Sequence, residues 1–408
     1  MKKTRQTLMS GIGLNARSAI CGGVISLSLG LATQVQGVAF RLPNQSPEGI
    51  ARGNAFAATA DNPSAIYYNP AGITQLAGQS VDVGIYLVSV GDTFDGPSGK
   101  GKTKSYFQTV PQLYYVNSFR DLPISVGLGV YAPYGLALDW GDSPFPNAAQ
   151  KGKLLYATIN PVVAWQVTPT LSLAIGPTIN YSEAQLWQGL PYAPGAQFHF
   201  RGNDTDFGFN AGMQWKPIEQ LAFGVNYHYL TAMNYSGHAN ASGLPTSTSA
   251  TGSLNFPQYV VGGISYRPTT NWNFEVDIDW TDWDSVNQIG FQNTPIGNFN
   301  FVQNYKSSLM YEFGVTRQLS HGYSVMAGYF YSENSIPDAT FNPIIPDSNL
   351  HLFSAGVAHR GQRWDWAFSY TCAVNPGREV QGSIYGSAVD GTYRTINHAL
   401  NGSITWKF

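Results

Sequence analysis

Apolar and polar residues alternate along much of the chain, most regularly between positions 272 and 280. There the apolar residues Trp272, Phe274, Val276, Ile278 and Trp280 alternate with the polar residues Asn273, Glu275, Asp277 and Asp279. A period of two indicates a β-strand with one apolar and one polar face. In a soluble sheet the apolar face lies in a core, whereas in an outer-membrane barrel it contacts lipid and the polar face lines the interior.

The alternating runs and the turn residues between them predict about fourteen strands. The expected spans are 80–90, 103–119, 123–132, 151–166, 170–185, 205–216, 219–237, 248–267, 270–285, 298–317, 321–334, 348–360, 363–374 and 394–408. The last strand alternates as far as Phe408 at the chain end. A terminal Phe of this kind resembles the signal that outer-membrane proteins present to the barrel insertion machinery.

The connections between these strands fall into two alternating classes. Short turns rich in Pro, Asn and charge are expected at 119–123, 166–170, 216–219, 267–271, 317–321 and 360–363. Longer connections are expected at 91–102, 133–150, 186–204, 238–247, 286–297, 335–347 and 375–393. Short periplasmic turns opposite long extracellular loops are typical of bacterial barrels, so residues 80–408 are predicted to form an antiparallel transmembrane β-barrel.

The start of the chain predicts export. Lys2, Lys3 and Arg5 precede an apolar stretch at 19–32, which is shorter than the roughly 20 residues that a transmembrane helix needs. This arrangement indicates a cleaved secretory signal over residues 1–37. Together with the barrel pattern, it predicts a location in the bacterial outer membrane.

Residues 38–79 do not fit the strand pattern. Positions 51–60 permit a helix, and turn residues follow at 61–64 and 69–72. A segment of this kind before a barrel is expected to plug the lumen as a hatch, with Asn69, Pro70, Ala71 and Gly72 as gating residues. The alternative is a flexible periplasmic tail.

Composition argues against several classes of function. The chain has 22 basic and 24 acidic residues, so no basic patch predicts nucleic-acid binding. The 7 His residues show no metal-ligand spacing, and no nucleophile motif stands between a strand and a helix. We therefore expect neither an enzyme nor a cofactor. Only 11% of residues are charged and 14% are aromatic, which suits a lipid-facing barrel with aromatic girdles.

Several short motifs, in order along the mature chain, carry a family resemblance. They are 39–42, 53–56, 61–64, Asn69-Pro70-Ala71, 134–140, 160–164, 279–283, 336–338 and 345–347. With them the chain resembles the FadL family of outer-membrane transporters, which includes the TodX-type hydrocarbon channels. The resemblance implies a fourteen-stranded barrel with an N-terminal hatch and a kinked third strand that opens the wall sideways to lipid.

The resemblance also implies passive uptake of hydrophobic small molecules by a monomer in outer-membrane lipid. Long-chain fatty acid is the expected cargo, and aromatic or other neutral hydrocarbons are the alternative. A general porin with an open lumen is the third hypothesis. The expected hatch argues against it.

The lateral opening is predicted at Gly129, Pro133 and Gly135, because Pro cannot donate to a strand ladder and Gly marks irregular strand positions. The alternative is an ordinary strand end near residue 131. Apolar loop residues are candidates for the first cargo contact, or else pack loop on loop: Leu136, Trp140, Phe145, Trp187 and Leu190.

Lys306 is the candidate for binding a carboxylate head group. It falls in the polar register of the predicted strand 298–317, so its side chain is expected to face the lumen. A buried charge must be paired, so the alternative is a salt bridge from Lys306 to Glu275, Asp277 or Asp279.

Overall fold

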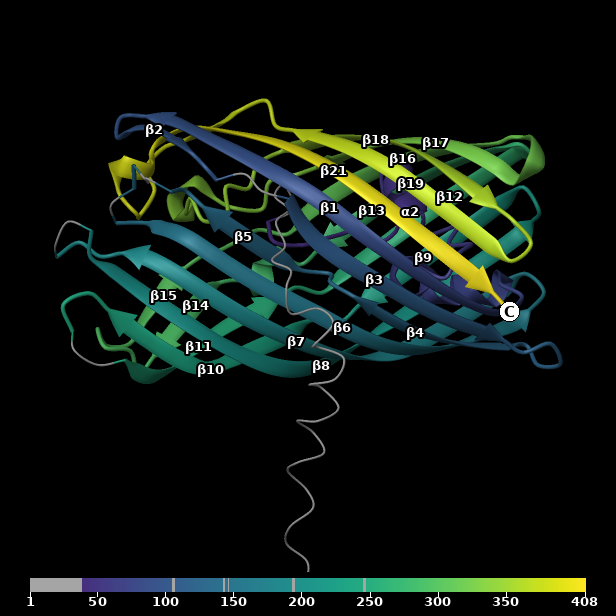
Figure 1. Cartoon of the computed structure of the whole chain (residues 1–408), viewed down its shortest axis with the longest axis horizontal. Helices are drawn as coiled ribbons and strands as arrows, with labels where there is room; N and C mark the ends of the chain where they lie inside the picture. Colours follow the sequence, from purple (N-terminus) through teal and green to yellow (C-terminus); the bar gives the residue numbers. More distant parts are fainter. Residues whose placement is uncertain (1–38, 105–106, 142–143, 146, 193–194, 245–246) are drawn as a thin grey trace, which may run out of the picture. The chain divides into compact units, whose positions relative to one another are not determined.

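The computed structural model describes residues 39–104, 107–141, 144–145, 147–192, 195–244 and 247–408. The predicted signal peptide lies outside the described residues. Long tilted strands form a single wall, with the C-terminus at the end where the short turns lie (Figure 1). β1 (Gly78–Gly96) pairs with β21 (Gly391–Lys407) along its length, so the sheet closes on itself. The predicted fourteen-stranded antiparallel barrel is confirmed.

Several wall strands consist of two elements in line. These are β2 (Gly99–Lys102) with β3 (Phe107–Ser118), β4 (Ile124–Tyr131) with β5 (Gly135–Asp139), β9 (Leu221–His228) with β10 (Thr231–Ala241), β11 (Thr248–Phe256) with β12 (Tyr259–Thr269), β13 (Trp272–Thr281) with β14 (Gln288–Gln292), β15 (Phe299–Val302) with β16 (Ser308–Gln318), and β19 (Trp364–Val374) with β20 (Arg378–Val380). The others are β1, β21, β6 (Ala149–Thr168), β7 (Leu171–Gly189), β8 (Gln197–Ile218), β17 (Tyr323–Ser332) and β18 (Leu350–Arg360).

The wall is apolar outside and polar inside. On β13, Phe274 is 45% exposed and Ile278 49%, whereas the carboxylate-bearing Glu275 and Asp277 are 1% and 0% exposed. A soluble protein would show the reverse, so the outer face of this strand is built to contact lipid.

Three of the predicted long loops are strand hairpins. β1 continues to Gly96 and pairs with β2, so most of 91–102 is strand. β7 and β8 extend into 186–204, and β10 extends into 238–247 as far as Ala241 and pairs with β11, which begins at Thr248 as predicted. These strands were predicted too short because they continue beyond the length that a membrane requires. In this part of β8 the alternation is reversed, since Phe198 and Phe200 face the interior and are 0% and 1% exposed.

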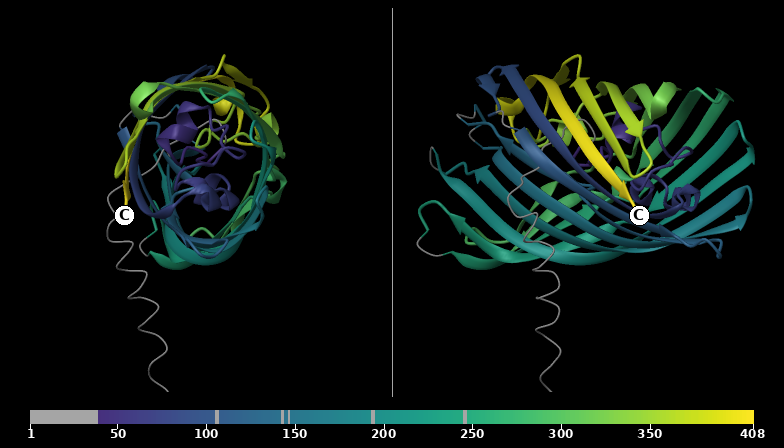
Figure 2. Two further views of the ribbon diagram at one scale, coloured as in Figure 1. Left: turned by 90° about the vertical axis from the view of Figure 1, so that its right-hand side faces the viewer. Right: turned by 45° about the vertical axis from the view of Figure 1, so that its right-hand side comes forward.

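Residues 39–77 form short helical turns inside the ring of strands, as the view along the barrel shows (Figure 2, left). They contain α2 (Pro47–Ala51), α3 (Ala65–Tyr68) and the 3₁₀ helix η1 (Pro70–Gln75). α2 and η1 begin with Pro, which is pre-organised for a first helical position and needs no hydrogen-bond acceptor there. We call residues 39–77 the hatch. Among the described residues, no helix is long and apolar enough to cross a bilayer.

Four more 3₁₀ turns lie in the loops and turns outside the hatch. They are η2 (Trp283–Ser285), η3 (Ser320–Gly322), η4 (Asp338–Thr340) and η5 (Ser387–Val389). Trp283 of η2 and Val389 of η5 belong to a large buried apolar cluster, and Ile336 and Phe341 on either side of η4 belong to it too.

Candidate functional site

The acidic inner face of β13 holds the hatch. Arg41 Nη1 lies 2.7 Å from Asp279 Oδ1, and Arg52 Nη2 lies 2.7 Å from Glu275 Oε2, with all four side chains buried. Asp277 Oδ2 accepts hydrogen bonds from the backbone N–H groups of Phe56 and Ala57. The lumen carboxylates therefore bind the hatch, and the expected pairing of Lys306 with them is wrong.

Asn69 joins the hatch to a second wall strand, β8. Its Nδ2 donates to the carbonyl of Ala57 at 2.7 Å and to the carbonyl of Met213 on β8 at 2.9 Å. Its Oδ1 accepts from the N–H of Ala71 and so caps η1. Pro70 packs against Gly212 so closely that an added Cβ there would lie 2.8 Å from Pro70 Cδ. The predicted gating residues thus form a fitted contact between hatch and barrel.

Gly72 completes this contact within the hatch. A Cβ on Gly72 would lie 2.3 Å from the carbonyl oxygen of Ala60, so only Gly fits this position. Gln75 donates from Nε2 to the carbonyls of Thr59 and Ala60, which fastens the end of η1 to the same turn.

The third wall strand leaves the ladder after Tyr131. β4 pairs with β3 as far as Val130 and with β6 as far as Tyr131, whereas β5 pairs with β6 only. Between β4 and β5 the chain bends to the hatch: Leu42 N–H donates to Pro133 O at 2.7 Å, and Gly135 N–H donates to Phe40 O at 2.9 Å. The break lies where Pro133 and Gly135 predicted an irregularity.

Gly129 lies within the continuous part of the wall and contacts the hatch. It pairs with Tyr114 on one side and Asn160 on the other, so the expectation that it interrupts the wall is wrong. A Cβ there would lie 2.8 Å from Ile66 Cγ2 of the hatch, so Gly129 makes room for α3 against the wall. Close backbone approach, the other common use of a strand Gly, applies here.

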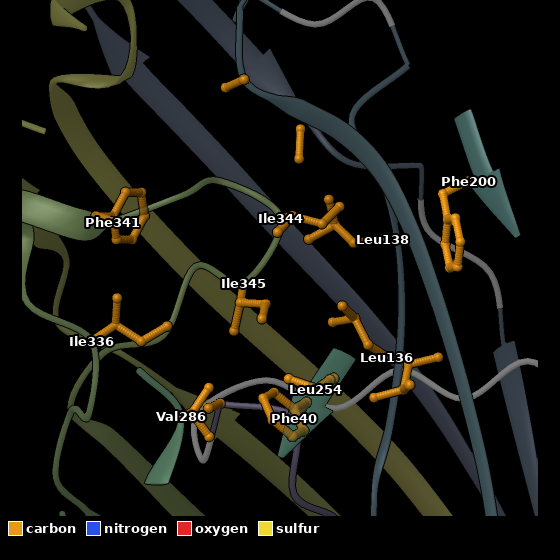
Figure 3. Close-up of a cluster of buried hydrophobic side chains, with 14 of the residues drawn as sticks. Phe40, Leu136, Leu138, Phe200, Leu254, Val286, Ile336, Phe341, Ile344 and Ile345 are labelled. Carbon is orange, nitrogen blue, oxygen red and sulfur yellow. The ribbon is translucent and has the colours of Figure 1, made fainter. Parts of the chain in front are cut away.

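An apolar cavity of about 90 Å³ lies beneath the loops, between the hatch and the wall. It is lined by Phe40, Leu136, Gly152, Lys153, Leu154, Ala184, Gln185, Leu186, Phe200, Tyr235, Gly252, Ser253, Leu254, Ile289, Phe291, Ile344 and Ile345. Figure 3 shows Phe40, Leu136, Leu254 and Ile345 close together in this cluster. The cavity suits a hydrophobic molecule, because apolar atoms dominate the lining.

Phe40 joins the cavity to the hatch. Its ring lies 4.8 Å from the Trp283 ring and 5.6 Å from the Phe256 ring, centroid to centroid, in edge-to-face contacts. The preceding residue is also fixed, because the N–H of Ala39 donates to the buried carboxylate of Asp347 at 3.2 Å. Burial raises the pKa of Asp347, and hydrogen bonds from Ser335 and Ala39 oppose that rise.

The comparisons with known proteins agree with this geometry. Residues 28–408 match the family model described as outer membrane protein transport protein (OMPP1/FadL/TodX). The chain belongs to this family. Its members are outer-membrane transporters of hydrophobic compounds rather than enzymes, so the predicted location and class of function are confirmed.

Individual relatives are distant in sequence and close in fold. The long-chain fatty acid transport protein of Escherichia coli K12 is 21% identical, over 86% of this chain and 90% of that protein. The crystal structure of a Pseudomonas aeruginosa FadL homologue superposes with a TM-score of 0.82 at 18% identity, covering 91% of this chain and 100% of that one. The Pseudomonas putida toluene transporter TodX gives 0.71 at 15% identity, covering 91% and 99%.

In this OMPP1/FadL/TodX family member, the apolar loop residues predicted to make the first contact with the cargo divide into two groups. Leu136 lines the cavity. Trp140, Phe145 and Leu190 lie in the same buried cluster without lining the cavity, and Trp140 Nε1 donates to the carbonyl of Pro343 at 2.9 Å. Trp187 stacks on His199 with ring centroids 4.4 Å apart and also lies away from the cavity. Most of the predicted loop residues therefore pack against other loop residues and do not line the cavity.

Lys306 does not face the lumen. It lies exposed in the segment before β16, which begins only at Ser308, so the predicted strand register does not reach it.

Of the described residues that line the cavity, Lys153 alone is charged. An isolated Lys in a loop-side strand carries no distinguishing pattern, so no signal in the sequence indicated Lys153. Phe40, Arg41 and Arg52 were missed as site residues since their partners lie more than two hundred positions away.

Proposed function

We propose that the chain carries long-chain fatty acids into the cell envelope, and that the acyl chain occupies the cavity beneath the loops. The observation that supports this is the cavity lining, which is apolar and has no carboxylate. Lys153 is the charged residue among the described lining residues; it lies between the inward-facing Gly152 and Leu154, so its amino group is on the outer face of β6 beside the cavity rather than inside it. An acyl chain gains about 0.8 kcal/mol for each methylene that it removes from water. A carboxylate head group requires a cation, and the hatch arginines are already paired with Asp279 and Glu275.

The route onward has two parts. The break between β4 and β5, at Pro133, lies next to the backbone of Phe40, so displacement of Phe40 would connect the cavity with the wall. We propose that cargo leaves sideways there, into lipid. The rest of the hatch, held by Asn69 and the β13 carboxylates, keeps the lumen closed to ions and water-soluble molecules.

Neutral hydrocarbons are the second candidate cargo. The observation that favours them is the small share of polar groups around the cavity, where only Lys153, Gln185 and Ser253 join the apolar lining and the Tyr235 ring. An uncharged ring would need none of these groups. The structures of the toluene transporters that resemble this chain share its fold at 15–18% identity, and this likeness alone does not favour either cargo.

The test is uptake of labelled oleate and labelled toluene by cells that lack their own transporter and express this chain. We expect Lys153→Ala to lower oleate uptake several-fold and to leave toluene uptake unchanged. Lys306→Ala is the matched control, because Lys306 is an exposed lysine outside the cavity. Oleate uptake that is equal in wild type and Lys153→Ala would exclude the head-group site, and toluene uptake without oleate uptake would establish the second candidate.

A further inference from the structure

A second break in the wall lies between β8 and β10. The ladder of β8 with β9 ends at the pair Asn210–His228, and the ladder of β8 with β10 begins only at Asn203–Ser236. Residues 204–208 of β8 therefore have no ladder partner on this side among the described pairings, and Phe209 keeps one backbone hydrogen bond, from the N–H of Tyr229. On the other side their pairing with β7 is continuous. The break is therefore confined to the boundary between β8 and the strand formed by β9 and β10, which we call the seam.

Two aspartates span this seam. Asp206 Oδ2 accepts a hydrogen bond from the N–H of Ala232 at 2.7 Å, and Asp204 Oδ2 accepts one from the N–H of Asn234 at 2.6 Å. Carboxylates here replace the carbonyl groups that a neighbouring strand would normally offer. Links made by side chains can be released without unzipping a backbone ladder.

A cavity of about 20 Å³ lies at the lower end of the seam and is lined by residues from both faces of the wall. Its inner lining includes Tyr134 and His228, which are 4% and 8% exposed. Its outer lining includes Phe209 and Tyr229, which are 37% and 45% exposed. The rings of Phe209 and Tyr229 stack 5.1 Å apart with an interplanar angle of 18°. This aromatic pair separates the cavity from the surroundings of the barrel.

The seam begins near the outer edge of the membrane. β8 runs from Ile218, at the short periplasmic turn, to Phe209 in nine residue steps. At roughly 3.4 Å per residue and a tilt of roughly 40°, these steps rise about 23 Å, which is close to the 25 Å apolar band of such barrels. Phe209 and Tyr229 therefore stand at the outer boundary of the hydrocarbon, and the unpaired residues continue above it.

We propose that this seam is a second lateral gate, through which uncharged hydrophobic solutes dissolved in the outer leaflet enter the barrel. It is distinct from the break at Pro133, and it is lined by Asp204 and Asp206, which repel a carboxylate anion. Toluene is a suitable probe, and oleate is not expected to pass. The inference rests on the family's transport of hydrophobic molecules and does not depend on the fatty-acid site at Lys153.

The test locks the aromatic pair with a disulfide. Phe209→Cys with Tyr229→Cys is made in a Cys372→Ser background and expressed in transporter-deficient cells. The two positions are adjacent across the seam, since Tyr229 N–H donates to Phe209 O at 2.9 Å. Phe313→Cys with Tyr329→Cys is the matched control. Phe313 and Tyr329 are ladder partners in the continuous wall, and their rings also stack.

We expect oxidation to lower toluene uptake several-fold in the 209/229 variant and reduction to restore it. Oleate uptake should not respond, and the 313/329 control should not respond for either probe. Toluene uptake that is unchanged after complete cross-linking would overturn the gate, and so would a wild-type chain that takes up oleate but no toluene. Loss of oleate uptake in the Lys153 variant bears on the proposed fatty-acid site alone.

A single substitution tests the gate if the cysteine pair prevents folding. Asp206→Ala removes the acceptor of the Ala232 N–H and should raise toluene uptake, with oleate uptake as in wild type. Asp284→Ala is the control, because Asp284 accepts from the backbone N–H of Ser307 in an exposed loop away from the seam. Equal toluene uptake in the folded Asp206→Ala, Asp284→Ala and wild-type barrels would overturn the proposal.

Discussion

Arg52 of the hatch and Glu275 of β13 form a buried ion pair, with Nη2 and Oε2 2.7 Å apart and side-chain exposures of 3% and 0%. The other carboxylate oxygen of Glu275 accepts from the N–H groups of Ala58 and Thr59. The hatch is therefore fastened to β13 by charge and hydrogen bonds. Contacts of this kind can be removed by substitution without touching the ladders that hold the barrel together.

Arg52→Ala should loosen the hatch and leave the barrel folded. The substitution leaves Glu275 as a buried charge without its cation. Breaking a buried ion pair in this way destabilises the folded state by about 3–5 kcal/mol. We expect increased ion conductance of the purified protein in planar bilayers, with unchanged strand content by circular dichroism.

Lys100→Ala is the control for Arg52→Ala. Lys100 pairs with Asp95 at 3.0 Å, but their side chains are 81% and 54% exposed, and such pairs contribute about 0–1 kcal/mol. This variant should conduct like wild type. Conductance of Arg52→Ala at the wild-type level would show that the ion pair does not hold the hatch.

The wall could be predicted from the sequence because its signal is local. Phe274 and Glu275 point to opposite faces as a direct result of backbone geometry, so alternation indicates which side of β13 meets lipid. The turn at 119–123 was predictable for the same reason, since Asp and Pro favour turns through their own side chains. The break at Pro133 also followed from a property of a single residue.

The site was less predictable because it depends on contacts between distant segments. Alternation identified Asp279 as a lumen residue but gave no indication that Arg41, 238 positions earlier, would be its partner. The role of Gly129 depends on Ile66 of the hatch, which the strand pattern does not contain. Lys306 was misplaced because β15 ends at Val302 and the chain departs from strand register before β16.

Gly212→Val should displace the Asn69-Pro70 contact from the wall. The added Cβ would lie 2.4 Å from Asn69 Oδ1 and 2.8 Å from Pro70 Cδ, so the hatch must move. We expect lower oleate uptake and higher conductance from a barrel that still inserts. Gly262→Val on β12 is the control, because a Cβ there meets nothing within 4 Å. Wild-type behaviour of folded Gly212→Val would contradict a gating role for this contact.

Gly152→Val should fill the apolar cavity beneath the loops. Its Cβ would lie 2.8 Å from Ile344 Cγ1, and overpacking of this kind typically costs 1–3 kcal/mol, about a tenfold loss of binding if the side chains do not give way. Oleate uptake should fall accordingly. Gly91→Val, whose Cβ would only touch Ile396 O at 3.6 Å, is the control. Equal uptake by the two variants would place the cargo elsewhere.

Asp61 should make the hatch sensitive to acid. Burial raises the pKa of Asp61, but the Arg360 and Arg267 guanidiniums at 3.0 and 3.5 Å outweigh it and hold the pKa below its ordinary value. A carboxyl whose pKa is lower in the folded state contributes its full stabilisation above the unfolded pKa of about 4. That stabilisation is lost as the pH falls through the pKa that the Asp61 carboxyl has in the folded state.

The conductance of wild type should therefore rise below about pH 4 as Asp61 becomes protonated and the hatch end separates from Arg360. Asp61→Asn should conduct more than wild type at neutral pH and show a smaller acid-induced rise. Asp95→Asn, which alters an exposed carboxylate paired only with Lys100, should follow the wild-type profile. An acid-induced rise of the same size in Asp61→Asn and wild type would assign the acid sensitivity to other carboxylates, with those of β13 first among them.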